Sequence, residues 1–173
     1  LSLTLLFWAL CHSLYTQSLE SKQYIERIKK DLAVSNLDTN KVLLLAQLCV
    51  AYRFQAPDSL NKYARLCLEL SRALHFPKGE IQVINSRGII LAFQGDAPKA
   101  LELLFEALRL SEQYNYPLET AISLSNIGSS YYFIGDFPKA LKYISKATSL
   151  IQHVSLTPNN LFREPYWKTY ITT

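Results

Sequence analysis

Residue types used in catalysis and metal binding occur in the chain, but their spacing does not group them into a site. His75 and His153 each lack a Cys, Asp or Glu at the spacing of metal ligands, and His12 lies in the apolar N-terminal stretch. Glu102 and Glu106 are one helical turn apart, which places both carboxylates on one helix face and not across a pocket. We therefore expect no catalytic site, no metal site and no cofactor, and we expect that the chain is not an enzyme.

The glycines form no phosphate-binding loop, because most of them belong to an internal repeat. Residues 93–110 and 133–150 are identical at nine of eighteen positions when the sequence is shifted by 40 residues. A fixed period of this size indicates a solenoid of stacked units. The small residues that carry the repeat are Gly88, Gly95, Ala100 and Ala107 in one unit and Gly128, Gly135, Ala140 and Ala147 in the next.

The spacing of apolar residues predicts an all-α fold, an α-solenoid of antiparallel helix pairs. We expect a leading helix and linker at residues 19–40 and three helical hairpins at residues 41–75, 81–115 and 121–152. In this division Pro77 to Gly79 form a connection, and residues 153–173 form a linker and the truncated first helix of a fourth pair.

Local chemistry predicts how the hairpins turn and pack. We expect Gly95 and Gly135 to follow the first helix of a pair in the left-handed conformation, and Asp96 and Asp136 to cap the second helix. A glycine inside a helix, such as Gly128, costs about 1 kcal/mol relative to alanine, so it predicts a close approach of two helices.

The cysteines are expected to be free. The 40-residue shift places Cys67 on Ala107 and Ala147, a position that takes a small buried side chain. Cys49 stands out of line with Cys67 across the predicted hairpin, so a disulfide bond between them is not expected.

Charge excludes one class of partner. The net charge is +4, and no run of five like charges occurs, so we expect no nucleic-acid partner. Membrane contact is expected only through a signal sequence or through a C-terminal anchor outside this sequence.

The N-terminal residues predict export. Residues 1–18 carry no charge and open with an apolar stretch that is typical of a signal peptide and too short to span a bilayer. The chain contains no Met, which favours a fragment of a longer reading frame. The alternative is that residues 1–18 form a packed first helix, which would place the protein in the cytoplasm.

These repeats resemble the tetratricopeptide repeat family, a resemblance that covers residues 41–152. It is carried by Gly88, Leu91, Gly95, Ala100, Leu104 and Ala107, and by Gly128, Tyr131, Gly135, Ala140, Ile144 and Ala147. The first unit departs from the pattern, with Leu48 at the helix glycine and Gln55 at the turn glycine. The resemblance implies a right-handed superhelix and a protein or peptide partner. The 40-residue period is similar to a longer-helix subclass found in kinesin light chains and bacterial peptide-sensing regulators.

A narrower resemblance combines the signal-like start with the segments at residues 38–45 and 57–60. Together with the repeats, they look like the N-terminal sensor region of Bacteroidetes-type signalling proteins, in which a histidine kinase or DNA-binding output follows. The function implied is a non-catalytic scaffold in the extracytoplasmic region of a signal-transduction protein. The alternatives are a cytoplasmic peptide-responsive regulator and a free-standing adaptor for cell-envelope assembly.

The family's geometry implies a concave groove lined by the first helix of each pair. The groove residues that it implies here are Tyr52, Asn85, Ile89, Ser125, Asn126, Ser129, Tyr132 and Phe133. They carry little charge, which favours an extended segment bound through its backbone. An equally weighted alternative is that Asn85 and Asn126 brace neighbouring helices.

The C-terminal residues predict a further contact. Tyr166, Trp167, Tyr170 and Ile171 cluster on one face of a helix that has no partner helix after it. An apolar end of this kind predicts either further repeats or self-association.

Overall fold

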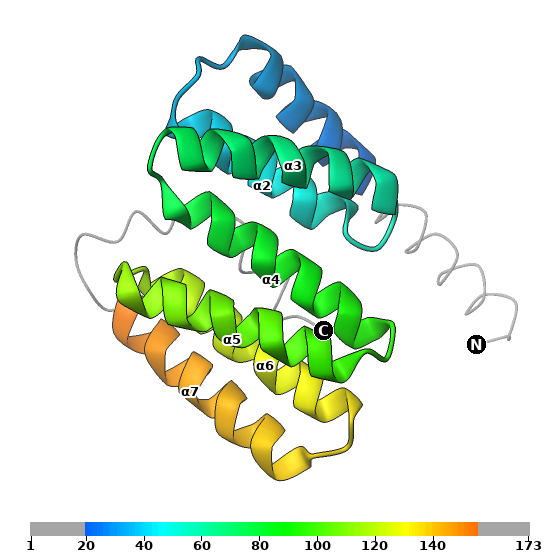
Figure 1. Ribbon diagram of the computed structural model, residues 1–173, viewed down its shortest axis with the longest axis vertical. Coiled ribbons are helices and arrows are strands. Elements are labelled where there is room, and N and C mark those ends of the chain that lie inside the picture. Colours follow the sequence, from blue (N-terminus) through cyan, green and yellow to red (C-terminus); the bar gives the residue numbers. More distant parts are fainter. Residues whose placement is uncertain (1–19, 156–173) are drawn as a thin grey trace, which may run out of the picture. The chain divides into compact units, whose positions relative to one another are not determined.

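A computed structural model describes residues 20–155, with side chains up to Gln152, and Figure 1 shows helices joined by short turns. The first helix covers residues 20–34. The helices that follow are α2 (Thr39–Tyr52), α3 (Pro57–Ala73), α4 (Pro77–Phe93), α5 (Ala97–Gln113), α6 (Pro117–Phe133) and α7 (Phe137–Ser155). The predicted all-α fold of antiparallel helix pairs is confirmed.

Two helices begin earlier than the sequence pattern indicated. α4 starts at Pro77 and α6 at Pro117, whereas we expected their hairpins to begin at residues 81 and 121. Proline suits the first turn of a helix because the amide hydrogen that it lacks has no partner within the helix there. The stretch from Pro77 to Gly79 is therefore the first turn of α4 and not a connection.

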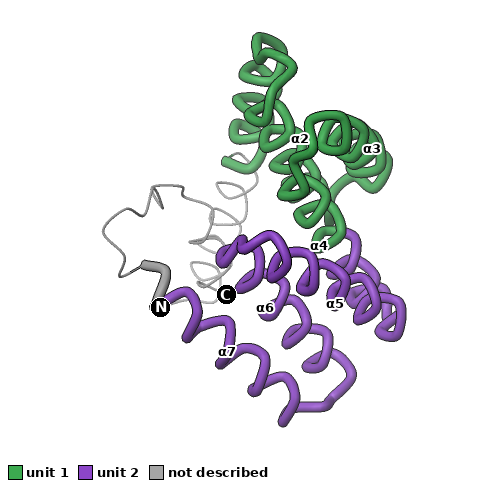
Figure 2. The backbone as a smooth tube through the Cα atoms, turned by 60° about the vertical axis from the view of Figure 1, so that its left-hand side comes forward, with its two compact units in different colours: residues 1–86 green, residues 87–173 purple. Residues whose placement is uncertain are grey.

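The chain divides into two compact units, residues 1–86 and residues 87–173, which Figure 2 colours green and purple. In the first unit, one core cluster consists of Val42, Leu45, Ala46, Cys49, Ala64, Cys67 and Val83. In the second unit, the buried apolar residues include Ala100, Leu104, Ala107, Leu124, Ile127, Ala140 and Ala147. The small residues of the predicted repeat are thus part of the core.

The leading helix packs on the first hairpin through the residue that departs from the repeat. Leu48 is fully buried and clusters with Ile25 and Ile28 of the helix at residues 20–34. A glycine at this position would remove the largest fully buried side chain that packs against those two isoleucines. The departure from the pattern at Leu48 is therefore explained by packing.

The turns within the last two hairpins have the predicted geometry. Gly95 (φ 85°) and Gly135 (φ 80°) adopt the left-handed conformation. The Gly95 amide donates to the Ala92 carbonyl (3.1 Å), and the Asp96 amide donates to the Leu91 carbonyl (2.9 Å). These two bonds form a Schellman motif, which satisfies carbonyl groups at the end of α4.

The connections between hairpins use the same motif without glycine, which the sequence pattern did not indicate. His75 (φ 50°) and Asn115 (φ 54°) stand in the left-handed region. The Phe76 amide donates to the Ser71 carbonyl (2.9 Å), and the corresponding bond after Asn115 measures 2.8 Å. The role of His75 is thus conformational, at the residue that follows the end of α3.

Aspartates cap three of the helices, as predicted for Asp96 and Asp136. The backbone amides of Lys41, Lys99 and Lys139 donate to the carboxylates of Asp38, Asp96 and Asp136 at 3.1, 3.4 and 3.2 Å. The ammonium groups of Lys99 and Lys139 also lie 2.8 Å from the carboxylates of Asp96 and Asp136. The hydrogen bonds from these lysines lower the pKa of both aspartates.

Glycines inside the helices mark close helix contacts. A Cβ atom at Gly88 would lie 2.6 Å from Cγ of Leu104, and one at Gly128 would lie 2.7 Å from Cγ1 of Ile144. Both distances are shorter than van der Waals contact. In these two pairs the helices therefore approach at a separation that only glycine permits, as predicted.

A third helical glycine, Gly79, brings the start of α4 against the first hairpin. A Cβ atom there would collide with the Val42 side chain and would lie 3.2 Å from Sγ of Cys67 and 3.1 Å from Oγ of Ser71. Our expectation that Gly79 belongs to a connection is wrong, because it packs inside the core of the first unit.

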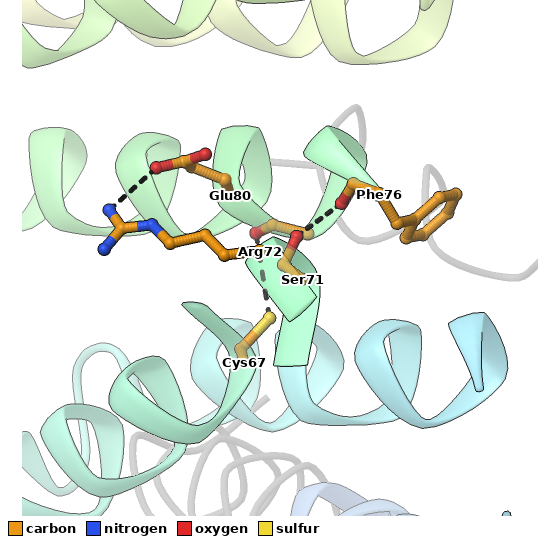
Figure 3. Close-up of polar contacts among 6 residues, drawn as sticks. Cys67, Ser71, Arg72, Phe76 and Glu80 are labelled. Carbon is orange, nitrogen blue, oxygen red and sulfur yellow. Dashed lines mark hydrogen bonds and ion pairs between the residues drawn. The ribbon is translucent and has the colours of Figure 1, made fainter. Parts of the chain in front are cut away.

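Figure 3 shows the polar contacts at the same junction between α3 and α4. The Cys67 thiol donates to the Gly79 carbonyl (3.7 Å), and the Ser71 hydroxyl donates to the Phe76 carbonyl. Arg72 forms an exposed ion pair with Glu80 (3.0 Å). The thiol and the hydroxyl thus satisfy backbone carbonyls close to the point where the chain passes into α4.

Among the described residues, Cys49 and Cys67 are buried and form no disulfide bond, as predicted. Cys67 and its repeat equivalents Ala107 and Ala147 are all buried, which confirms the small-residue position. Burial, and after it the charge of a Cys49 thiolate, raises the pKa of the Cys67 thiol to about 12. Cys67 is therefore a structural thiol.

Candidate binding surface

One face of α6 is accessible and carries no charge. Between residues 118 and 132, most side chains of the helix are buried. The exceptions are Tyr131, whose ring stacks on Tyr143 of α7, and a stripe of five residues. The stripe follows the helical period and consists of Leu118, Ile122, Ser125, Ser129 and Tyr132. We call these five residues the α6 stripe. Its members are half-buried except Tyr132, which is exposed.

Aromatic rings gather where the α6 stripe ends. The rings of Phe93 and Phe133 lie with centroids 4.7 Å apart, and Tyr132 lies 6.1 Å from Phe133 and 5.7 Å from Phe137. All four residues are exposed. We call them the aromatic cluster. Exposed apolar groups that contact one another are typical of an interaction site.

The structure separates the predicted groove residues of the second unit into two groups. Ser125, Ser129, Tyr132 and Phe133 are accessible, and the first three share one helix face. Ile89 and Asn126 are buried, and so is Asn85 of the first unit. The expectation that these three residues contact a partner is not supported, because their side chains are covered. Their burial favours the alternative that the two asparagines brace neighbouring helices.

Tyr52 is engaged within the first unit. Its ring stacks on Tyr63 with centroids 5.7 Å apart and planes 5° from parallel, and Lys29 lies 5.9 Å from the centre of the same ring. The Glu26 carboxylate and the Tyr52 hydroxyl raise the pKa of Lys29. Tyr52 therefore joins the leading helix to the first hairpin, and this packing contact explains it without a partner.

Sequence reasoning missed four residues of the surface. Leu118 and Ile122 precede Ser125 by seven and three residues, so extending the helical period toward the start of α6 would have found them. Phe93 and Phe137 belong to the aromatic cluster through contacts with residues of other helices. The sequence hinted only at Phe93, which is the repeat equivalent of Phe133.

Hydroxyl groups on the buried faces of α6 bond to backbone. The Ser123 and Ser130 hydroxyls donate to carbonyls four residues earlier (both 2.9 Å), and the Thr120 hydroxyl bonds to the Ser111 hydroxyl of α5 (3.0 Å). Glu119 is buried as well. Burial, and after it the Glu119 charge, raises the pKa of Tyr116. These polar residues position α6 and do not form a reactive cluster.

Within the described residues, no three His, Cys, Asp or Glu side chains are placed to hold a metal ion. Glu102 and Glu106 are exposed on α5. His12 lies outside the described residues, as does the side chain of His153. In the part of the chain that the structure describes, no helix combines the length and the apolar character needed to cross a membrane.

The repeat period, the helix pairs and the glycine contacts agree with one known family. Residues 79–152 match the family model of the tetratricopeptide repeat. The match runs from the first turn of α4 to near the end of α7, so it covers the α6 stripe and the aromatic cluster. A comparison with curated proteins finds no match. Tetratricopeptide repeats are in general non-catalytic scaffolds for protein interaction, and the match supports that role for these residues.

Proposed function

We propose that the chain is a non-catalytic scaffold that binds an extended protein or peptide segment along α6. The observation that carries the proposal is the accessible, uncharged α6 stripe, which leads to four exposed aromatic rings. A helix face that served only to contact solvent would carry charged residues. This one has serine hydroxyls between apolar side chains instead.

The chemistry of the stripe favours a neutral partner segment. The Ser129 hydroxyl donates to the Ser125 carbonyl (3.1 Å), so its oxygen remains able to accept a hydrogen bond from a peptide amide. Leu118 and Ile122 offer apolar contact beside it. The aromatic cluster would take an apolar side chain of the partner as an anchor.

Selection from a displayed library of random peptides, with the full chain as bait, tests this proposal. We expect enriched peptides to be uncharged and to contain an apolar anchor. Ser129→Lys should block binding along the stripe. Tyr132→Ala should lower the affinity for the selected peptides by about tenfold or more, as for other central aromatic contacts. The matched control is Ser149→Lys, which places the same charge on an exposed position of α7. Failure to enrich any peptide, or equal binding by Ser129→Lys, would contradict the proposal.

We further propose that this scaffold is the exported sensory region of a bacterial signal-transduction protein, of the 40-residue subclass. The uncharged residues 1–18 and the period support this. Fusion of the chain to alkaline phosphatase tests export, since that enzyme is active only outside the reducing cytoplasm. An inactive fusion would favour the cytoplasmic peptide-responsive regulator.

Sequencing the gene beyond both ends of this chain tests whether the protein carries a signalling output. We expect the longer reading frame to encode a membrane helix and a histidine kinase or similar module. A stop codon directly downstream would favour the free-standing cell-envelope adaptor. Self-association stays a prediction as well, because the aromatic residues that motivate it lie outside the described residues.

A further inference from the structure

The last described helix exposes apolar positions that its repeat equivalent buries. In α5, Leu104 is fully buried, and Leu101 and Leu108 are half-buried. The equivalent positions of α7 are Leu141 (68% exposed), Ile144 (41% exposed) and Thr148 (exposed). We call these three residues the α7 edge. The two helices differ here although they occupy the same place in their hairpins.

The difference comes from the helix that follows. Leu104 and Ile144 each lie against the helix glycine of their own pair, Gly88 and Gly128, so their contacts inside the hairpin are alike. α5 is also packed against the next helix, α6. No described helix follows α7. The exposed α7 edge is therefore the surface on which a further first helix would pack.

We propose that residues 165–173 of the same chain cover the α7 edge as the first helix of a fourth pair. α4 and α6 both begin at a proline, Pro77 and Pro117. Pro165 can start a helix in the same way, eight residues later than the 40-residue period, which falls beside Pro158. After it, an apolar face with helical spacing consists of Tyr166, Trp167, Tyr170 and Ile171. The α7 edge is mainly apolar, as is this predicted face, so each can remove the other from water.

The covalent link favours this segment over a second copy of the chain. Nine residues, 156–164, join α7 to Pro165, and at full extension they reach about 30 Å, enough to return from the end of a helix to its side. A tether of this length gives a local concentration in the millimolar range, far above that of a separate molecule. The α7 edge thus becomes part of the chain's own core and leaves the α6 stripe as the open surface.

Tryptophan fluorescence of the full chain tests the proposal. The chain has two tryptophans, Trp8 and Trp167, so Trp8→Phe leaves Trp167 as the only emitter. We expect blue-shifted emission and protection from acrylamide. In this background Leu141→Lys should put an unpaired charge under the docked segment, shift docking toward the open form by about tenfold and increase quenching.

Two further variants keep the test decisive. Thr148→Lys places the charge on the same edge at an already exposed position, so it cannot act by unfolding α7, and it should also increase quenching. Ser149→Lys, outside the edge, should leave emission unchanged while circular dichroism verifies helicity. A solvent-exposed Trp167 in the parent, or no response to both edge variants, would overturn the proposal. Protection that disappears on dilution would overturn it too, because the occupant would then be a second copy.

Discussion

At the scale of single residues, Gly128 and Gly88 occupy equivalent positions and each lies against the same kind of side chain, but the facing backbone is closer at Gly128. A Cβ atom at Gly128 would approach the backbone of α7, at 3.1 Å from the Ala140 carbonyl oxygen and 3.2 Å from the Ile144 nitrogen. At Gly88 the closest atoms belong to the Leu104 side chain, and the nearest backbone oxygen is 3.4 Å away. A side chain can change its rotamer, whereas a helix backbone must move as a unit.

We therefore predict that Gly128→Ala destabilises the protein more than Gly88→Ala. Overpacking costs roughly 1–3 kcal/mol and outweighs the helix propensity of alanine at Gly128, whereas the two effects come closer to balance at Gly88. Thermal unfolding followed by circular dichroism measures both variants. Ser145→Ala, on an exposed part of α7, is the neutral control. A Gly128→Ala melting temperature equal to that of the wild type would contradict the packing of this hairpin.

The Cys67 thiol predicts a pattern of chemical reactivity. With a pKa of about 12 it carries almost no thiolate near pH 8, and it is buried, so alkylation should require unfolding. Mass spectrometry after brief iodoacetamide treatment should find Cys67 unmodified in the native protein and modified in guanidinium chloride. Because the folded-state pKa is raised, this thiol contributes stability at neutral pH that is lost as the pH rises from about 9 toward 12. Rapid native labelling of Cys67 would show that the core of the first unit opens readily.

The capping aspartates predict the opposite pH dependence. Hydrogen bonds from Lys99 and Lys139 lower the pKa of Asp96 and Asp136 in the folded state. Their contribution to stability is therefore present above the unfolded-state pKa and is lost as the pH falls through the folded-state value. Asn at both positions keeps a capping oxygen but removes the charge. We expect the melting temperature of this double variant to fall less between pH 5 and 3 than that of the wild type. An equal fall in both proteins would show that the two carboxylates do not contribute to stability.

At the scale of elements, the turns differ in how well their residues suit the left-handed conformation. Gly135→Ala should cost roughly 1–2 kcal/mol, because no atom lies within 4 Å of its Cβ position and backbone strain acts alone. His75→Gly should stabilise the protein by about 0.5–1 kcal/mol. The substitution relieves the backbone strain at this residue, and the greater flexibility of glycine in the unfolded chain offsets part of that gain. Asn115→Gly should change little, since asparagine tolerates this conformation best. Denaturant unfolding measures all three, and a destabilised His75→Gly would indicate that the imidazole packs usefully.

At the scale of the whole molecule, repeat architecture predicts that a local change has a local effect. The free energy of unfolding of stacked repeats is close to the sum of the stability of each repeat and of its interfaces with the adjacent repeats. Gly128→Ala should therefore reduce amide hydrogen-exchange protection in α6 and α7 and leave α2 and α3 nearly unchanged. An equal loss of protection in all helices would show that the described chain unfolds as a single cooperative unit.

Features that depend on near neighbours in sequence were predictable. The left-handed Gly95, the capping Asp136 and the close contact at Gly128 follow from the needs of a helix end or a helix pair, and each is confirmed. The helix start at Pro77 was missed, because proline suits a connection and a first turn equally well. His75 was missed because a non-glycine residue in the left-handed region leaves no compositional signal.

The candidate surface was only partly predictable for a related reason. The helical period places Ser125, Ser129 and Tyr132 on one face, and the structure keeps them accessible. The same repeat logic chose Ile89 and Asn85, which the structure buries. A residue's position in a repeat determines its direction from the helix axis, whereas its exposure depends on the size of side chains on other helices.

By itself, the sequence determined the helix pairs, their period and their turns, because these depend on backbone conformation and on residues within a few turns of each other. Only the tertiary structure decided which predicted groove residues are open, how Leu48 replaces a glycine by packing on the leading helix, and that Ile144 is exposed where Leu104 is buried. Exposure is a property of the neighbours that cover a side chain, and those neighbours come from separate helices.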